Sequence, residues 1–298
     1  MTVKTAIVTG AASGIGMGYA AALVEKGYFV LVTDVNEVGA KQVAAHLTSK
    51  GPGTAEAAFL DVRDGDAIRA TVQGVKDRFG RLDLMFNNAG MFVGGPVEDL
   101  TPEHWDRAID VMIRGVAYGV DAAYKIMVEQ GFGGIVNTAS MAGLATIGYM
   151  GPYNMAKHAV VGMSNALHGE AKKHGVHVTC VCPIAINTNI LLGINDGLGE
   201  WRGGDGLGAF YRRFGRFGKF VPNFILMDPV VHGRKVLLAV QRNKAIIIKP
   251  AYGKAVWVLA RIGPRLPYLA GDVGTRVLAK VEPVFVRAAE SLDPAPKA

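Results

Sequence analysis

Two side chains that could move a proton stand four residues apart near the middle of the chain. Tyr153 and Lys157 would lie on one face of a helix, because residues at this spacing are neighbours on its surface. A phenol with a pKa of about 10 is a poor base at neutral pH, and a cation such as Lys157 would favour its phenolate. Ser140, earlier in the chain, can hydrogen-bond a substrate oxygen. Together they could move the proton that hydride transfer at an adjoining carbinol carbon requires.

The Tyr153 and Lys157 pair is weak evidence by itself. In a chain of this length with 9 tyrosines and this lysine content, the expected number of tyrosine–lysine pairs at this spacing by chance alone is about 0.5. The pair gains weight from its context, because Ser140 ends one expected strand and the pair lies in the expected helix that follows. The prediction therefore depends on the elements that position these side chains.

The elements alternate in a regular pattern. Short β-branched runs are separated by amphipathic stretches of helical length, which is typical of a parallel sheet covered on both faces. Strands are expected at residues 3–9, 28–34, 54–60, 82–86, 134–139, 176–182 and 244–248. Helices are expected at residues 14–27, 37–49, 65–79, 102–130, 152–174 and 229–242. This predicts an α/β fold with one doubly wound, seven-stranded parallel sheet and helices on both faces.

The first expected strand runs into a glycine-rich turn that opens a helix. Gly10, Gly14 and Gly16 allow a tight turn and a close approach of backbone N–H groups to a pyrophosphate. Ser13 and Ile15 lie between these glycines, where the helix N-terminus contributes partial positive charge. Such a turn alone is weak evidence for a dinucleotide site.

Asp34 strengthens this interpretation because it ends the second expected strand, 18 residues beyond Gly16. A carboxylate there can accept both hydroxyls of an adenosine ribose, and its charge would repel a 2′-phosphate. No basic residue stands at Ser13 or Val35 to receive such a phosphate. We therefore favour NAD over NADP.

Residues 9–16, Thr-Gly-x-x-x-Gly-x-Gly, resemble the glycine motif of classical short-chain dehydrogenases/reductases. The resemblance implies a Rossmann-like NAD-dependent enzyme that transfers a hydride between the cofactor and a secondary alcohol or ketone. Its catalytic residues would be Ser140, Tyr153 and Lys157. The adenine would be read at Asp61 and Val62, and the Asn-Asn-Ala-Gly run at residues 87–90 would support the cofactor's adenosine side. The residues implied in cofactor binding are Gly10, Ser13, Gly14, Ile15, Gly16, Asp34, Asp61, Val62, Asn88, Tyr153, Lys157, Ile186 and Thr188.

Two positions depart from the family pattern. Met112 stands where the family usually has a fourth catalytic residue, an Asn that helps hold a water behind the lysine. A backbone carbonyl at Met112 could still serve, so we expect an altered proton relay in an active enzyme. Ile184 replaces a glycine after the sixth strand and cannot adopt φ > 0 cheaply, which puts cofactor placement in question.

Charge is distributed unevenly along the chain. Residues 1–200 hold 15 basic and 19 acidic side chains, a balance of −4, whereas residues 201–298 hold 17 and 6, a balance of +11. Residues 188–228 would form a substrate lid, whose aromatic side chains favour a bulky apolar substrate. We favour a solvated exterior as the explanation for the basic residues of the lid. Contact with an anionic substrate group or an acidic membrane surface is the second explanation. We expect no nucleic-acid partner.

We expect one NAD-binding domain at residues 1–250, including the lid, and a basic and apolar extension at residues 251–298. In that extension Trp257, Val258 and Leu259 stand beside Lys254, Arg261 and Arg265. This grouping would suit an interfacial helix, although packing against a neighbouring subunit is the commoner explanation.

The remaining features favour a cytoplasmic location, and we also expect a homodimer or homotetramer. The N-terminus has no room for a signal peptide, and no run of 18 apolar residues occurs. Cys180 and Cys182 are expected to be buried free thiols, and the seven histidines show no metal-ligand spacing. Two alternatives remain open: a catalytically impaired NAD-binding regulatory protein on the same fold, and an NADP-linked ketone reductase.

Overall fold

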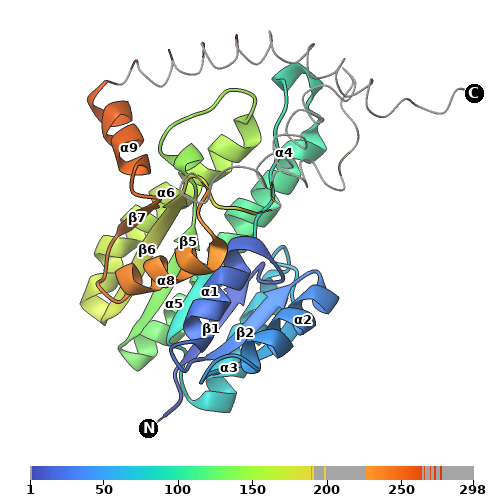
Figure 1. The fold of residues 1–298 in the computed structure, drawn as a ribbon, viewed down its shortest axis with the longest axis vertical. Coiled ribbons are helices and arrows are strands. Elements are labelled where there is room, and N and C mark those ends of the chain that lie inside the picture. Colours follow the sequence, from blue (N-terminus) through green and yellow to red (C-terminus); the bar gives the residue numbers. More distant parts are fainter. Residues whose placement is uncertain are drawn as a thin grey trace, which may run out of the picture.

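The computed structural model describes residues 2–188 and 226–263, with single further positions at 190, 198, 265, 269, 272 and 276. In this part of the chain seven parallel strands form one sheet in the order β3-β2-β1-β4-β5-β6-β7 (Figure 1). The strands are β1 (Thr5–Thr9), β2 (Phe29–Asp34), β3 (Thr54–Phe59), β4 (Leu84–Asn87), β5 (Gly133–Thr138), β6 (Val176–Pro183) and β7 (Ile246–Lys249). The doubly wound, seven-stranded α/β fold predicted from the sequence is confirmed.

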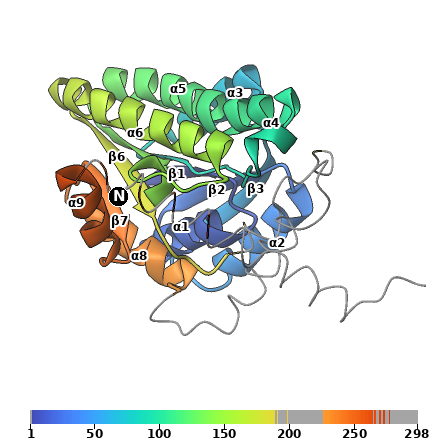
Figure 2. The same ribbon diagram turned by 90° about the horizontal axis from the view of Figure 1, so that it is seen from above.

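Helices cover both faces of this sheet. Figure 2 shows α1, α2 and α8 on one side and α3, α4, α5 and α6 on the other. No helix in the described part of the chain is both long and apolar enough to span a bilayer. The helices are α1 (Gly14–Val24), α2 (Glu37–Thr48), α3 (Gly65–Phe79), α4 (Pro102–Ile109), α5 (Gly115–Gln130), α6 (Gly151–Ala171), α8 (Pro229–Val240) and α9 (Gly253–Ile262).

The central strands are held from both sides by apolar packing. β1 is buried along its whole length, and so is β4. One buried cluster joins the sheet to α1, α2 and α8, and a second joins its other face to α3 and α5. The strand order reverses between β1 and β4, so the chain leaves these two neighbouring strands in opposite directions. In open α/β sheets, such a switch point leaves a crevice at the carboxyl ends of the strands.

The expected helix at residues 102–130 is interrupted. The chain forms α4, then a π-helical turn at Asp110–Arg114, and then α5. One-turn π-helical segments widen a helix locally and occur often at functional sites. Met112, which replaces the family's Asn, lies inside this turn and is fully buried. The 3.6-residue periodicity of the sequence gave no signal for the interruption.

Candidate active site

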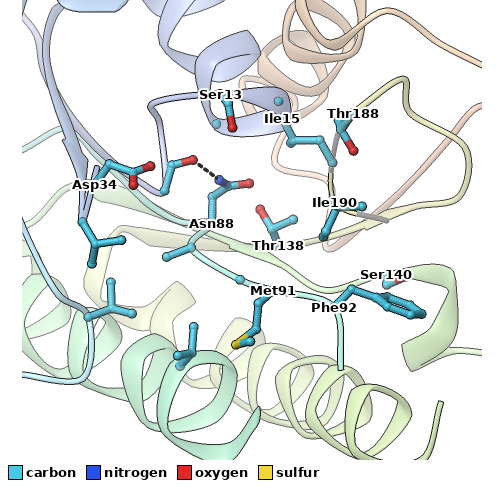
Figure 3. Close-up of a pocket in the computed structure, with 18 of the residues that line it drawn as sticks. Ser13, Ile15, Asp34, Asn88, Met91, Phe92, Thr138, Ser140, Thr188 and Ile190 are labelled. Atoms are coloured by element: carbon cyan, nitrogen blue, oxygen red, sulfur yellow. Dashed lines mark hydrogen bonds between the residues drawn. The ribbon is translucent and has the colours of Figure 1, made fainter. Parts of the chain in front are cut away.

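One cavity of about 830 Å³ opens at the carboxyl ends of the strands, where the strand order reverses. Figure 3 shows Asp34 at one end of it, and Ser140 and Phe92 at the other. Every residue that the sequence assigned to the site lines this cavity: Gly10, Ser13, Gly14, Ile15, Gly16, Asp34, Asp61, Val62, Asn88, Ser140, Tyr153, Lys157, Ile186 and Thr188. The fold thus brings together residues from widely separated parts of the chain.

The glycine turn after β1 has no room for side chains at two of its positions. Gly10 has φ +62°, and a Cβ there would lie 2.6 Å from the Ala89 Cα. A Cβ on Gly16 would lie 2.2 Å from the Gly10 carbonyl oxygen. Both positions therefore need glycine, the first for its backbone conformation as well.

Asn88 fixes the shape of this turn from the neighbouring strand. Its Nδ2 donates to the carbonyl oxygens of Thr9 at 3.0 Å and of Gly10 at 3.1 Å. The Thr9 hydroxyl in turn accepts the backbone N–H groups of Asn88 and Ala89 at 2.9 and 3.0 Å. These bonds tie the ends of β1 and β4 together, so the glycine turn is held in place before any ligand arrives.

The N-terminus of α1 fits a diphosphate. Ser13 precedes this helix and its side chain makes no capping hydrogen bond to the first turn. Gly14 has φ +55°, and a Cβ there would lie 3.3 Å from the Thr188 Cγ2. Backbone N–H groups and the helix dipole favour an anion at such a position. The first turn of α1 together with Thr188 would therefore hold the phosphates of a dinucleotide.

Asp34 ends β2 and faces the cavity with a fixed carboxylate. Its Oδ2 accepts the Ala12 N–H at 3.0 Å, and its Oδ1 accepts the Asn36 N–H at 2.9 Å. Each oxygen keeps further lone pairs, so the carboxylate can still accept ribose hydroxyls. The same negative charge disfavours a 2′-phosphate at this end of the cavity.

Asp61 is paired with a residue that the sequence analysis did not assign to the site. The Arg63 guanidinium donates to both carboxylate oxygens of Asp61, with Nε at 3.0 and 2.9 Å. This contact holds the pKa of Asp61 below its usual range. Arg63 also lines the cavity, so this ion pair borders the end where Asp34 lies. The position of Arg63, two residues after Asp61, was the signal in the sequence that could have identified it as a cavity residue.

The three expected catalytic side chains lie at the other end of the cavity. Tyr153 is buried, and its hydroxyl interacts with the Ser140 side chain. The Lys157 Nζ lies 5.5 Å from the centre of the Tyr153 ring and donates to the Thr138 carbonyl oxygen at 3.0 Å. A half-buried hydroxyl, a buried phenol and a buried amine are thus gathered at one end of the cavity.

Burial changes the acidity of both reactive groups. It raises the pKa of Tyr153, while the hydrogen bond with Ser140 acts in the opposite direction. Burial lowers the pKa of Lys157 to about 8, so the amine is mostly a cation at pH 7. Tyr153 is therefore a neutral phenol in the protein alone, and Lys157 does not by itself create the phenolate that the sequence analysis expected.

The pKa of Lys157 makes folding stability depend on pH in a testable way. Between about pH 8 and the unperturbed value of about 10.4, the unfolded chain keeps the Lys157 proton and the folded chain does not. Stability contributed by this group therefore rises across that window, by up to about 3 kcal/mol. Urea unfolding should show this rise, and Lys157→Met should lack it. Lys125→Met, at a side chain that is 70% exposed, is the matched control and should retain it.

The structure accommodates both departures from the family pattern, Ile184 through its backbone conformation and Met112 through its packing. The non-glycine residues with positive φ in the described part of the chain are Tyr149 and Asn243. Ile184 therefore keeps an ordinary backbone conformation, with its N–H bonded to the Lys249 carbonyl oxygen at 3.1 Å. Met112 packs in a buried cluster that includes Tyr153, so an apolar side chain backs the reactive group.

Apolar side chains line part of the cavity. Met91, Phe92, Ile184 and Ile190 are among them, and the Phe92 and Tyr153 ring centres are 5.1 Å apart. Met91 and Phe92 were not predicted, although their position directly after the Asn-Asn-Ala-Gly run was a signal for them. The Thr138 carbonyl had no such signal, because a backbone acceptor has no residue signature.

The segment expected to form the lid begins and ends at one place. Ile186 and Met227 form a parallel bridge, in which the Asn187 N–H reaches the Met227 carbonyl and the Met227 N–H reaches the Ala185 carbonyl, both at 2.9 Å. The bridge lies beside Thr188, which lines the cavity. Most of the expected lid, including all of residues 199–225 with their basic and aromatic side chains, lies outside the described residues.

Comparison with known proteins gives concordant results. A family model described as short chain dehydrogenase matches residues 4–198. Levodione reductase from Leifsonia aquatica is 34% identical over 189 residues, which are 63% of this chain and 71% of that protein. A protein named "Probable oxidoreductase EphD" from Mycobacterium tuberculosis is 37% identical over 185 residues, which are 62% of this chain and only 31% of that longer protein.

Two solved structures resemble the fold and differ in their cofactor. A short chain dehydrogenase/reductase from Burkholderia phymatum in complex with NAD has a TM-score of 0.79 and 27% identity, covering 89% of this chain and 95% of that one. A short-chain dehydrogenase from Sphingobium yanoikuyae in complex with NADPH has a TM-score of 0.71 and 25% identity, covering 90% and 95%. Similar folds therefore hold either dinucleotide.

Proposed function

Because the chain belongs to the short chain dehydrogenase family and is an oxidoreductase of that family, we propose that it transfers a hydride between NAD and a secondary alcohol or ketone. The observation that carries this proposal is that one cavity has Asp34 at one end and Ser140, Tyr153 and Lys157 at the other. The apolar lining around Phe92 supports an apolar substrate of medium to large size.

Asp34 supports NAD as the cofactor. Its carboxylate is held by two backbone N–H groups at the end of the cavity opposite Tyr153. Relatives of similar fold bind either NAD or NADPH, so the choice for this chain rests on its own residues. A fixed negative charge favours a ribose diol over a ribose carrying a 2′-phosphate.

The residues divide the proton chemistry among them. NAD, when bound, supplies the nicotinamide that accepts or donates the hydride. In the reduction direction the neutral Tyr153 phenol gives its proton to the carbonyl oxygen, and in the oxidation direction the Tyr153 phenolate, formed once the phenol has lost its own proton, takes the hydroxyl proton of the alcohol. Ser140 hydrogen-bonds the same oxygen, and the Lys157 cation stabilises the phenolate. Oxidation is the physiological direction that we favour, since cellular NAD is mostly oxidised.

The test is NAD reduction by the purified chain across a series of secondary alcohols, followed by the absorbance of NADH. We expect reduction with apolar alcohols, and a lower kcat/KM when NADP replaces NAD. Tight NAD binding without turnover of any alcohol would contradict the proposal. Such a result would favour a regulatory protein with the same fold. Met112 is the observation behind this alternative, because it offers no polar side chain behind Tyr153.

The homo-oligomeric state, the cytoplasmic location and the division of the chain at residue 250 stay predictions. The observed bounds of β7 and α9 support the division of the chain at residue 250. β7 ends the sheet at Lys249, and α9 begins four residues later outside the sheet layers. We keep residues 251–298 as an extension on that basis.

A further inference from the structure

α9 rests on the edge of the sheet through one narrow side. Gly253 is buried there, and a Cβ on it would lie 2.9 Å from the Ile248 Cγ2 and 3.4 Å from the Ile184 Cγ2. One turn later, Trp257 packs against the buried cluster that contains Cys182 and Ile248. Figure 1 shows α9 standing above β7, at the end of the sheet farthest from α2.

The outward side of α9 is apolar, which inverts the usual pattern. Val256, Val258, Leu259 and Ile262 are 43%, 45%, 57% and 79% exposed. At about 100° per residue they form one continuous arc with the exposed Ala255, opposite Gly253. A surface helix of a water-soluble domain turns its polar residues to this side. Contiguous exposed apolar side chains instead mark a contact surface.

Basic side chains border this arc. Lys254 and Arg261 lie two turns apart along one edge of it, Arg265 follows the helix, and all three are exposed. No acidic residue occurs from residue 229 to residue 271, nor in β6. A helix with an exposed apolar face and with lysine and arginine beside it is the pattern of an interfacial membrane helix.

The charges distinguish between two occupants of this face, a second copy of the chain and an anionic lipid surface. A second copy of the same face would bring Lys254 and Arg261 near their own counterparts, and neither α9 nor β7 carries an acid to pair with them. Anionic lipid headgroups would neutralise these charges while the aliphatic arc enters the headgroup and acyl boundary. We propose that α9 docks this protein on the surface of membranes rich in anionic lipid.

The proposal is tested with the full chain and two kinds of vesicle, phosphatidylcholine alone and phosphatidylcholine mixed with an equal amount of phosphatidylserine. We expect co-sedimentation with the mixed vesicles that weakens as salt is raised. Leu259→Glu and Ile262→Glu should each weaken it at least about tenfold. Lys254→Glu should weaken it at least about fivefold. Val38→Glu, at a 67% exposed valine of α2, is the matched control and should bind as the unaltered chain does.

Three results would overturn the proposal: no binding to the mixed vesicles at low salt, equal binding by the Ile262→Glu variant, or a lower mass of that variant in lipid-free solution. The last would identify the face as an interface between copies of the chain. The variants lie outside the cavity lining, so their turnover of dissolved substrate should equal that of the unaltered chain. Loss of vesicle binding with unchanged turnover separates this proposal from the proposed function.

Discussion

Replacing Tyr153 with phenylalanine is expected to lower kcat for alcohol oxidation about 10³-fold, since proton transfer by a positioned side chain is worth roughly 10²–10⁴-fold. The phenyl ring can keep its contact with Phe92, so the packing around it should remain. Ser140 keeps its hydrogen bond with the Ala142 N–H, which the substitution does not touch. The affinity for NAD, measured by fluorescence titration, should change little.

Tyr124→Phe is the matched control for this variant. Tyr124 lies on α5, and its hydroxyl is buried without a partner among the described residues. Removing that hydroxyl should leave kcat unchanged and should not lower the free energy of unfolding. If Tyr153→Phe turned over alcohols at the rate of the unaltered chain, another group would have to carry the proton.

Asp34→Ala is expected to reverse the cofactor preference. Loss of hydrogen bonds from the ribose hydroxyls to a carboxylate should lower kcat/KM for NAD about 10²-fold. The substitution also releases the N–H groups of Ala12 and Asn36, which now bond the carboxylate. Both could then donate to a 2′-phosphate, so kcat/KM for NADP should rise. Steady-state kinetics with the two cofactors and one alcohol give the ratio.

Asp34→Asn separates charge from hydrogen bonding in this prediction. The amide keeps an acceptor for one of the two backbone N–H groups but carries no negative charge. We expect it to lose less activity with NAD than Asp34→Ala does, and to gain less with NADP. An unaltered preference in both variants would mean that the carboxylate does not face the ribose, and the NAD assignment would lose its support.

The sequence predicted the elements well because the signals were repeated and local. Each expected strand lies within two residues of its observed bounds, since runs such as Phe29–Asp34 are rich in β-branched residues and lie between helical stretches. The residues of the cavity were found for a related reason. The carboxyl ends of parallel strands meet at one edge, so Asp34, Asn88 and Ser140 had to converge once the strands were placed.

What the sequence did not predict depends on packing between distant segments. The π-helical turn around Met112 depends on how α4 and α5 meet the rest of the fold, and helical periodicity does not record it. The acceptor of Lys157 is a backbone carbonyl, which any residue at position 138 would offer. The lowered pKa of Lys157 comes from burial, and a sequence shows only that a lysine is present.

The parallel bridge between Ile186 and Met227 has a consequence for how such a chain can change over evolutionary time. Both ends of the intervening stretch are anchored by backbone hydrogen bonds, which do not depend on the side chains between them. Loop insertions cost little once their ends are joined, because the closure entropy grows slowly with length. The number of residues between these two anchors could therefore change over evolutionary time while the bridge and the glycine turn stay as they are.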